Sequence, residues 1–125
     1  MNISHEDCSL LRETCDQPGK QGSFFEQNHD LSKLPKKVDV VYTTRWETMG
    51  VKHKGRVGGD SWKDKFVSYK VNEKLMEQVS GKQTLFMHDL PAMRGQDVTN
   101  EVLDGPQFVA FRQAKHKMTA ARAIL

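Results

Sequence analysis

The fold class is decided by residues 38–43, VDVVYT. This run is rich in β-branched residues and shows little alternation of apolar and polar side chains, which is typical of a parallel strand covered on both faces. A second apolar run, Thr84–Met87, predicts another buried strand. Segments with helical spacing lie between and after these runs, so the sequence predicts an α/β fold with an open, mostly parallel sheet.

Several helix signals surround the two strands. Residues 4–15 could form a helix before the breaker at residues 17–19, and residues 24–26 could add a short strand. Ser61 is a plausible N-cap for a helix that reaches Tyr69, and Asn72 is a plausible N-cap for the next one. Residues 98–103 predict a short helical turn, residues 108–110 an extended piece, and residues 113–125 a closing helix.

The composition excludes several classes of protein. A chain of 125 residues with 37% hydrophobic and 28% charged residues is typical of one globular domain. The net charge of +3 is small, and the basic stretches lack the interleaved aromatic residues of a nucleic-acid binder. No apolar run approaches the roughly 20 residues that a membrane span needs.

The cysteines and the N-terminus bear on location and metal binding. Cys8 and Cys15 have no second cysteine pair or histidine at a spacing that completes a zinc site. Residues 1–7 have neither the basic nor the apolar part of a signal peptide. We therefore expect a cytoplasmic protein with reduced thiols, without a metal or cofactor and without a nucleic-acid or membrane partner.

Two loops of unusual composition follow the two predicted strands. One covers residues 43–50, TTRWETMG, and the other covers residues 88–95, HDLPAMRG. In open α/β sheets, ligands bind in the loops beyond the carboxyl ends of the strands. The two loops are therefore the predicted walls of a substrate pocket.

These loops resemble segments of the ornithine carbamoyltransferases. Residues 40–50 are similar to the family segment VIYTDVWxSMG, and residues 86–95 are similar to the family segment FxHCLPAxRG. The resemblance covers about residues 22–125 and leaves residues 1–21 as a poorly defined N-terminal segment. It implies a partial amino-acid-binding (C-terminal) domain, Rossmann-like and three-layered, without its first strand–helix units. An aspartate-type or otherwise specialised transcarbamylase is the alternative within the superfamily.

The resemblance also implies roles for residues of the second loop and of the closing helix. His88 matches a catalytic histidine that donates a hydrogen bond to the carbamoyl oxygen as charge develops. Leu90 and Pro91 match a pair with a cis peptide bond, whose backbone carbonyls face the substrate amine. Arg94 either anchors the loop or contacts the ligand. Lys117 stands where the family has an arginine directed at the carbamoyl group, although it could equally be a solvated helix lysine.

Thr44, Arg45 and Asp89, three positions near the predicted pocket, depart from the family pattern. Thr44 replaces the aspartate that holds the α-amino group of the substrate, and Asp89 replaces a cysteine. A carboxylate at position 89 would favour a cationic group on the substrate, or would need a partner such as Arg45. Either Asp89 or Glu47 could supply the negative charge that is lost at position 44.

Two further residues complete the predicted substrate-binding set. Thr48 keeps the hydroxyl of a family serine, and Met49 follows it. We expect Met49 and the nearby Trp46 to contribute to packing and loop shape more than to chemistry.

The resemblance implies transfer of a carbamoyl group from carbamoyl phosphate to an ornithine-like amine. Such transfer depends on positioning two substrates and on stabilising an oxyanion. The Ser-x-Arg-Thr-Arg and His-Pro-x-Gln motifs that bind carbamoyl phosphate in the family do not occur in this sequence. We expect this chain to be catalytically incomplete and to meet carbamoyl phosphate only with a complementary N-terminal domain. The alternative is a non-catalytic interaction module, or a gene remnant, that associates with a full-length transcarbamylase.

Overall fold

The computed structural model describes residues 5–17, 19, 22–46 and 61–125. The chain divides into two compact units, Met1–Lys33 and Leu34–Leu125. This division falls after Lys33. The sequence predicts that the partial amino-acid-binding domain starts after residue 21, and that domain boundary stays a prediction.

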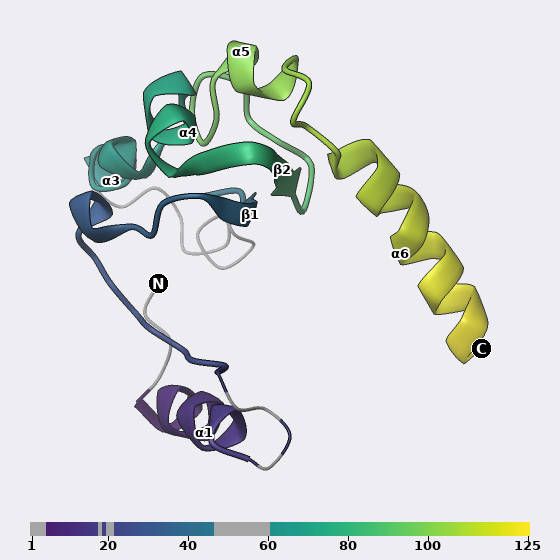
Figure 1. The fold of residues 1–125 in the computed structure, drawn as a ribbon. Helices are drawn as coiled ribbons and strands as arrows, with labels where there is room; N and C mark the ends of the chain where they lie inside the picture. Colours follow the sequence, from purple (N-terminus) through teal and green to yellow (C-terminus); the bar gives the residue numbers. More distant parts are fainter. Residues whose placement is uncertain (1–4, 18, 20–21, 47–60) are drawn as a thin grey trace. The chain divides into compact units, whose positions relative to one another are not determined.

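The first unit contains the helix α1 (His5–Cys15), which confirms the predicted N-terminal helix (Figure 1). Cys8 is buried on this helix, and its thiol donates to Gln27 Oε1 at 3.1 Å. The strand predicted at residues 24–26 is wrong, because this segment has no regular secondary structure and Phe24 is 81% exposed. An apolar pair alone does not form a strand without a neighbouring strand to complete its hydrogen bonds.

The second unit is built on two parallel strands, β1 (Val38–Thr43) and β2 (Ser80–His88). Both predicted strands are confirmed, and the register pairs Val41 with Phe86 and Thr43 with His88. The expectation that β1 is covered on both faces is wrong, since Val40 is 46% and Tyr42 is 53% exposed. In the described part of the chain, β2 is the only strand that pairs with β1, so one edge of β1 carries no neighbouring strand.

The segment between the strands contains the short helix α3 (Ser61–Asp64) and the helix α4 (Glu73–Val79). The helix predicted from Ser61 to Tyr69 is too long. It gives way to tighter turns, in which the amides of Phe66 and Tyr69 donate to carbonyls three residues earlier, each at 2.8 Å. The predicted cap of α4 is confirmed, because Asn72 Oδ1 accepts from the amide of Leu75 at 2.9 Å.

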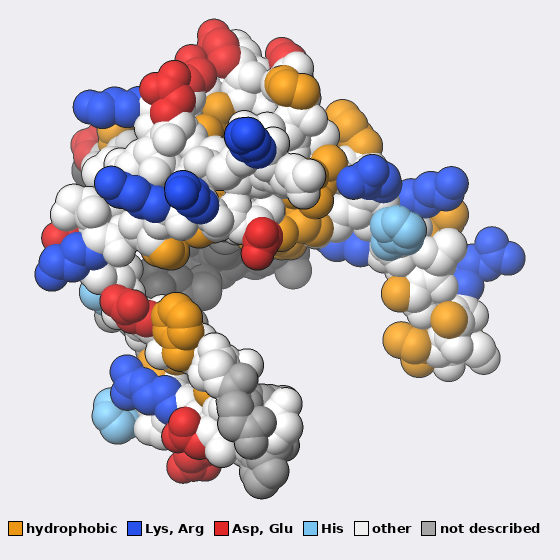
Figure 2. Space-filling model, viewed as in Figure 1, with side chains coloured by type: hydrophobic (Ala, Val, Ile, Leu, Met, Phe, Trp, Pro, Cys, Tyr) orange, Lys and Arg blue, Asp and Glu red, His pale blue; other side chains and the backbone are white. Residues whose placement is uncertain are grey.

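The helices α5 (Asn100–Leu103) and α6 (Ala110–Ile124) follow β2. The closing helix therefore begins three residues earlier than predicted, and the extended piece predicted at residues 108–110 is reduced to a single bridge between Phe108 and Phe86. Helix α6 carries exposed apolar side chains, among them Phe111 and Met118, beside basic ones (Figure 2). No helix among the described residues is long and apolar enough to cross a membrane.

The core of the second unit lies where α4 and α5 meet β2. Its fully buried centre is formed by Phe86 and Val98, and the side chains packed around them are Val71, Met76, Val102 and Leu103. Burying a side chain as large as phenylalanine contributes about 2 to 3 kcal/mol to folding. The core therefore fixes the carboxyl end of β2, from which the second predicted loop begins.

Candidate functional site

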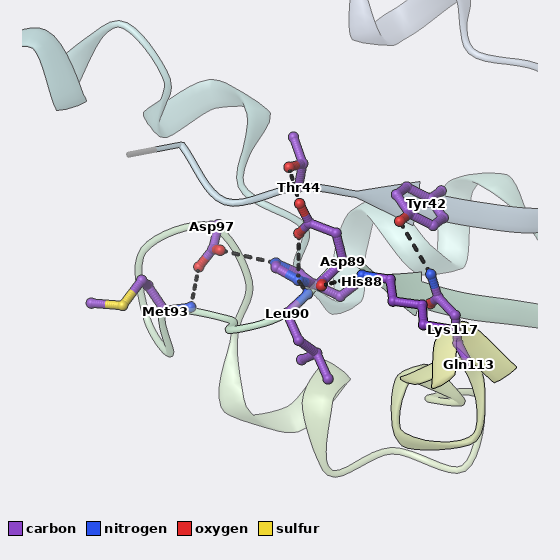
Figure 3. Close-up of polar contacts among 9 residues, drawn as sticks. All are labelled: Tyr42, Thr44, His88, Asp89, Leu90, Met93, Asp97, Gln113 and Lys117. Atoms are coloured by element: carbon purple, nitrogen blue, oxygen red, sulfur yellow. Dashed lines mark hydrogen bonds and ion pairs between the residues drawn. The ribbon is translucent and has the colours of Figure 1, made fainter. Parts of the chain in front are cut away.

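The predicted loops meet at the carboxyl ends of the two strands. Thr43 and His88 are partners in the parallel register, so the next residues, Thr44 and Asp89, lie side by side. The hydroxyl of Thr44 donates to Asp89 Oδ2 at 2.7 Å (Figure 3). Two of the positions at which the sequence departs from the family pattern therefore contact each other directly.

His88 is the last residue of β2, and its side chain is completely buried. The amide of Leu90 donates to His88 Nδ1 at 2.8 Å, and His88 Nε2 lies 3.0 Å from Asp97 Oδ2 (Figure 3). Because Nδ1 accepts a hydrogen bond, the ring proton of the neutral imidazole belongs on Nε2, which donates to Asp97. Both ring nitrogens are thus used within the chain.

Asp97 is a site residue that the sequence did not single out. Its side chain is fully buried, and its second oxygen, Oδ1, accepts from the amide of Met93 at 2.8 Å. The residue sits in a glycine-containing turn, where an aspartate is usually solvated. Its burial depends on the path of the loop from residue 88 to residue 97, for which the local sequence carries no signal.

Asp89 is 38% exposed, and its two carboxylate oxygens have different surroundings. Oδ2 holds the hydroxyl of Thr44, whereas Oδ1 is shielded from solvent and accepts no hydrogen bond from the described residues. Oδ1 lies 3.1 Å from His88 Nδ1, but that nitrogen is itself an acceptor here. The carboxylate therefore has one oxygen that lacks a donor.

Helix α6 places a positively charged side chain beside the loop that follows β2. Lys117 Nζ donates to the backbone carbonyl of Asp89 at 2.9 Å, so Lys117 contacts the loop rather than only solvent (Figure 3). Gln113, one turn earlier, donates to the hydroxyl of Tyr42 on β1 at 3.1 Å. Helix α6 therefore contacts β1 and the residue that directly follows β2.

The remaining predicted residues have four different outcomes. The Leu90–Pro91 peptide bond is cis, as the resemblance implies. Arg94 anchors the loop, because its guanidinium donates to both carboxylate oxygens of Asp104, at 2.7 and 2.9 Å. Arg45 is partly buried and its pairing with Asp89 stays a prediction. The residues that lie outside the described part of the chain are Glu47, Thr48 and Met49.

The site as described is suited to binding rather than to attack on a substrate. It brings together a carboxylate and a hydroxyl from the residues that directly follow β2 and β1, and an ammonium group from α6. In the described residues, no group of three or more His, Cys, Asp or Glu side chains is placed to hold a metal ion. An acceptor oxygen beside a hydroxyl suits a ligand that carries N–H donors.

Comparison with known proteins shows which family this chain resembles in sequence and structure. Residues 3–125 match the family model for the aspartate/ornithine carbamoyltransferase Asp/Orn binding domain. The ornithine carbamoyltransferase of Methanothermobacter thermautotrophicus is 39% identical over 104 residues, which are 83% of this chain and 33% of that protein. The enzyme of Pyrobaculum aerophilum is 40% identical over 116 residues, which are 93% of this chain and 36% of that protein.

Solved structures show the same relationship. Ornithine transcarbamoylase from Giardia lamblia superposes with a TM-score of 0.79 at 30% identity, over 99% of this chain and 36% of that chain. Ornithine carbamoyltransferase from Pyrococcus furiosus superposes with a TM-score of 0.65 at 34% identity, over 77% and 29% of the two chains. The α/β fold is thus that of part of a carbamoyltransferase, and the chain spans about a third of the length of the relatives it matches.

Proposed function

Because the chain belongs to the aspartate/ornithine carbamoyltransferase family, we propose that it forms the amino-acid-binding side of a carbamoyl-transfer site. The observation that carries this proposal is the meeting of Asp89, Thr44 and Lys117 at the carboxyl ends of the strands. The ligand we propose is an ornithine-like amino acid, whose ammonium group binds the carboxylate of Asp89. Thr48, Met49 and the backbone carbonyls of Leu90 and Pro91 are proposed to complete the pocket.

In this proposal His88 has a different immediate task from the one that the resemblance implies. Its ring nitrogens are bonded to the amide of Leu90 and to Asp97, so a hydrogen bond to a carbamoyl oxygen would require one of these bonds to break. We assign to His88 the holding of the loop that carries Asp89 and Leu90. Its direct role as a donor in catalysis stays a prediction.

The whole transfer reaction needs a second binding site. The amine nitrogen attacks the carbonyl carbon of carbamoyl phosphate, phosphate leaves, and the nitrogen loses a proton. Lys117 brings a cation to this corner, but the carbamoyl phosphate site belongs to a complementary part of the enzyme in our proposal. We therefore expect that this 125-residue chain forms no citrulline from ornithine and carbamoyl phosphate. We propose that the complete reaction takes place in the cytoplasm.

Titration of the 125-residue chain tests the proposed ligand. L-ornithine should bind, and N-acetyl-L-ornithine, whose α-nitrogen is no longer cationic, should report whether Asp89 takes the α-ammonium or the side-chain ammonium. Asp89→Asn should weaken ornithine binding roughly 10- to 100-fold, since a hydrogen bond to a charged group contributes about 1.5 to 3 kcal/mol. The matched control is Asp104→Asn, which alters a carboxylate already paired with Arg94. Equal ornithine affinity in the wild type and Asp89→Asn would contradict the proposal.

A second candidate function is association with a carbamoyltransferase subunit. The observation that favours it is the exposure of apolar side chains on α6, where Phe111 is 75%, Met118 is 58% and Ile124 is 85% exposed. Apolar residues in such numbers on one helix are typical of a surface that another polypeptide covers. Co-purification with a full-length ornithine carbamoyltransferase, abolished by Met118→Lys, would support this function, and a monomeric profile in the presence of that enzyme would oppose it.

A further inference from the structure

Two acceptor atoms of the site, His88 Nδ1 and Asp89 Oδ1, lie 3.1 Å apart. If Nδ1 carried a proton, it could donate a hydrogen bond to Oδ1 at this distance. With Nδ1 unprotonated, Oδ1 has no donor among the described residues. The tautomer of His88 therefore decides whether Asp89 Oδ1, which is shielded from solvent in this structure, has a donor inside the chain.

Asp97 is the group that sets this tautomer. It approaches the opposite nitrogen, Nε2, at 3.0 Å, and a carboxylate can only accept a hydrogen bond. The Nε2–H form of the ring satisfies Asp97, while its free Nδ1 accepts the amide of Leu90 at 2.8 Å. In the Nδ1–H form, two acceptors, Nε2 and Asp97 Oδ2, would face each other. Two donors, Nδ1–H and the amide of Leu90, would also face each other.

We propose that Asp97 is a positioning residue, which fixes the Nε2–H tautomer of His88 and so leaves Asp89 Oδ1 without a donor inside the chain, as the acceptor for a ligand N–H that reaches this shielded atom. Only the part of this proposal that concerns the ligand rests on the proposed function. The assignment of the tautomer does not, because it follows from contacts inside the chain. Asp97 is fully buried and acts on Asp89 only through His88.

The substitution Asp97→Asn reverses the hydrogen-bond pattern with little change in shape. The amide of Met93 needs an acceptor, so the side-chain oxygen of the new amide turns to Met93 and its NH2 group turns to His88. Nε2 then accepts, and the ring proton moves to Nδ1. The Nδ1 proton can donate to Asp89 Oδ1, which then no longer lacks a donor inside the chain.

Nitrogen-15 NMR of the full chain, labelled at histidine, tests the tautomer directly. The wild type should show His88 with a protonated Nε2 and an unprotonated Nδ1, and Asp97→Asn should show the reverse. His88→Gln locates the His88 signals, and Asp104→Asn, a carboxylate exchanged on the same loop, should leave the His88 tautomer unchanged. A wild-type His88 protonated at Nδ1, or an Asp97→Asn spectrum that keeps the wild-type pattern, would overturn the proposal. The wild-type spectrum decides the matter even where Asp97→Asn does not fold.

Ornithine titration of the same variants tests the consequence for the ligand. Asp97→Asn should lower ornithine affinity roughly tenfold, as expected for the loss of one hydrogen bond. A reversed tautomer with unchanged affinity would refute the link from Asp97 to Asp89. Absence of ornithine binding by a wild type that has the Nε2–H tautomer would contradict the proposed function and leave the assignment of the tautomer standing.

Discussion

Two carboxylates in the segment between β2 and α6, one before and one after α5, have nitrogen partners, and their surroundings differ sharply. Asp97 and His88 are buried, with side chains 1% and 0% exposed, and their atoms lie 3.0 Å apart. Asp104 and Arg94 are 65% and 53% exposed, yet their contact is shorter, at 2.7 Å, and involves both carboxylate oxygens. Distance alone would rank the exposed pair first. Burial reverses that order, because water replaces the lost partner only at the surface.

The largest effect should follow removal of the buried carboxylate. Asp97→Ala leaves His88 Nε2–H and the amide of Met93 without acceptors in the core, so we expect a loss of about 3 to 5 kcal/mol in the free energy of unfolding. Urea unfolding followed by circular dichroism measures this loss. Arg94→Ala is the matched control from the exposed pair and should change the free energy by less than about 1 kcal/mol. Equal losses in the two variants would refute the ranking by burial.

An intermediate effect, on ligand binding and not on folding, should follow a change at Thr44. Thr44→Val removes the donor to Asp89 Oδ2 at an exposed position, so the free energy of unfolding should change by no more than about 0.5 kcal/mol. The carboxylate would then lose its fixed orientation, and we expect ornithine affinity to fall roughly three- to tenfold. Thr44→Ser keeps the hydroxyl and should bind ornithine as the wild type does. A Thr44→Val chain with wild-type affinity would show that the hydroxyl does not orient Asp89.

Parts of the fold and of the site could be predicted from the sequence. The strands β1 and β2 and the cap of α4 at Asn72 depend on local patterns, and all three were predictable. The contact of Thr44 with Asp89 joins residues 45 positions apart, but the rule that parallel strands end at one edge of a sheet brings these positions together. The family resemblance then marked both positions as unusual.

Asp97 could not be predicted in the same way. Its role depends on a loop that folds back to bury the aspartate side chain against His88, and an aspartate in a turn is normally expected at the surface. The early start of α6 and the exposed face of β1 were missed for a related reason. Both depend on which neighbours the chain supplies in three dimensions, and not on the residues of the segment itself.

The smallest effect should come from titrating the exposed pair. The guanidinium of Arg94, by hydrogen bonding and then by its charge, holds the pKa of Asp104 below its ordinary value of 3.8. A folded-state pKa below the unfolded value means that the pair stabilises the fold above pH 3.8 and that this stabilisation is lost as the pH falls through the lower, folded-state pKa. Urea midpoints measured from pH 6 down to about pH 3 should therefore fall slightly more steeply for the wild type than for Asp104→Asn. Molar concentrations of salt should remove the difference, because the pair is open to solvent. A difference that persists in high salt would mean that the pair is shielded from water, and the contrast between the two carboxylates would then fail.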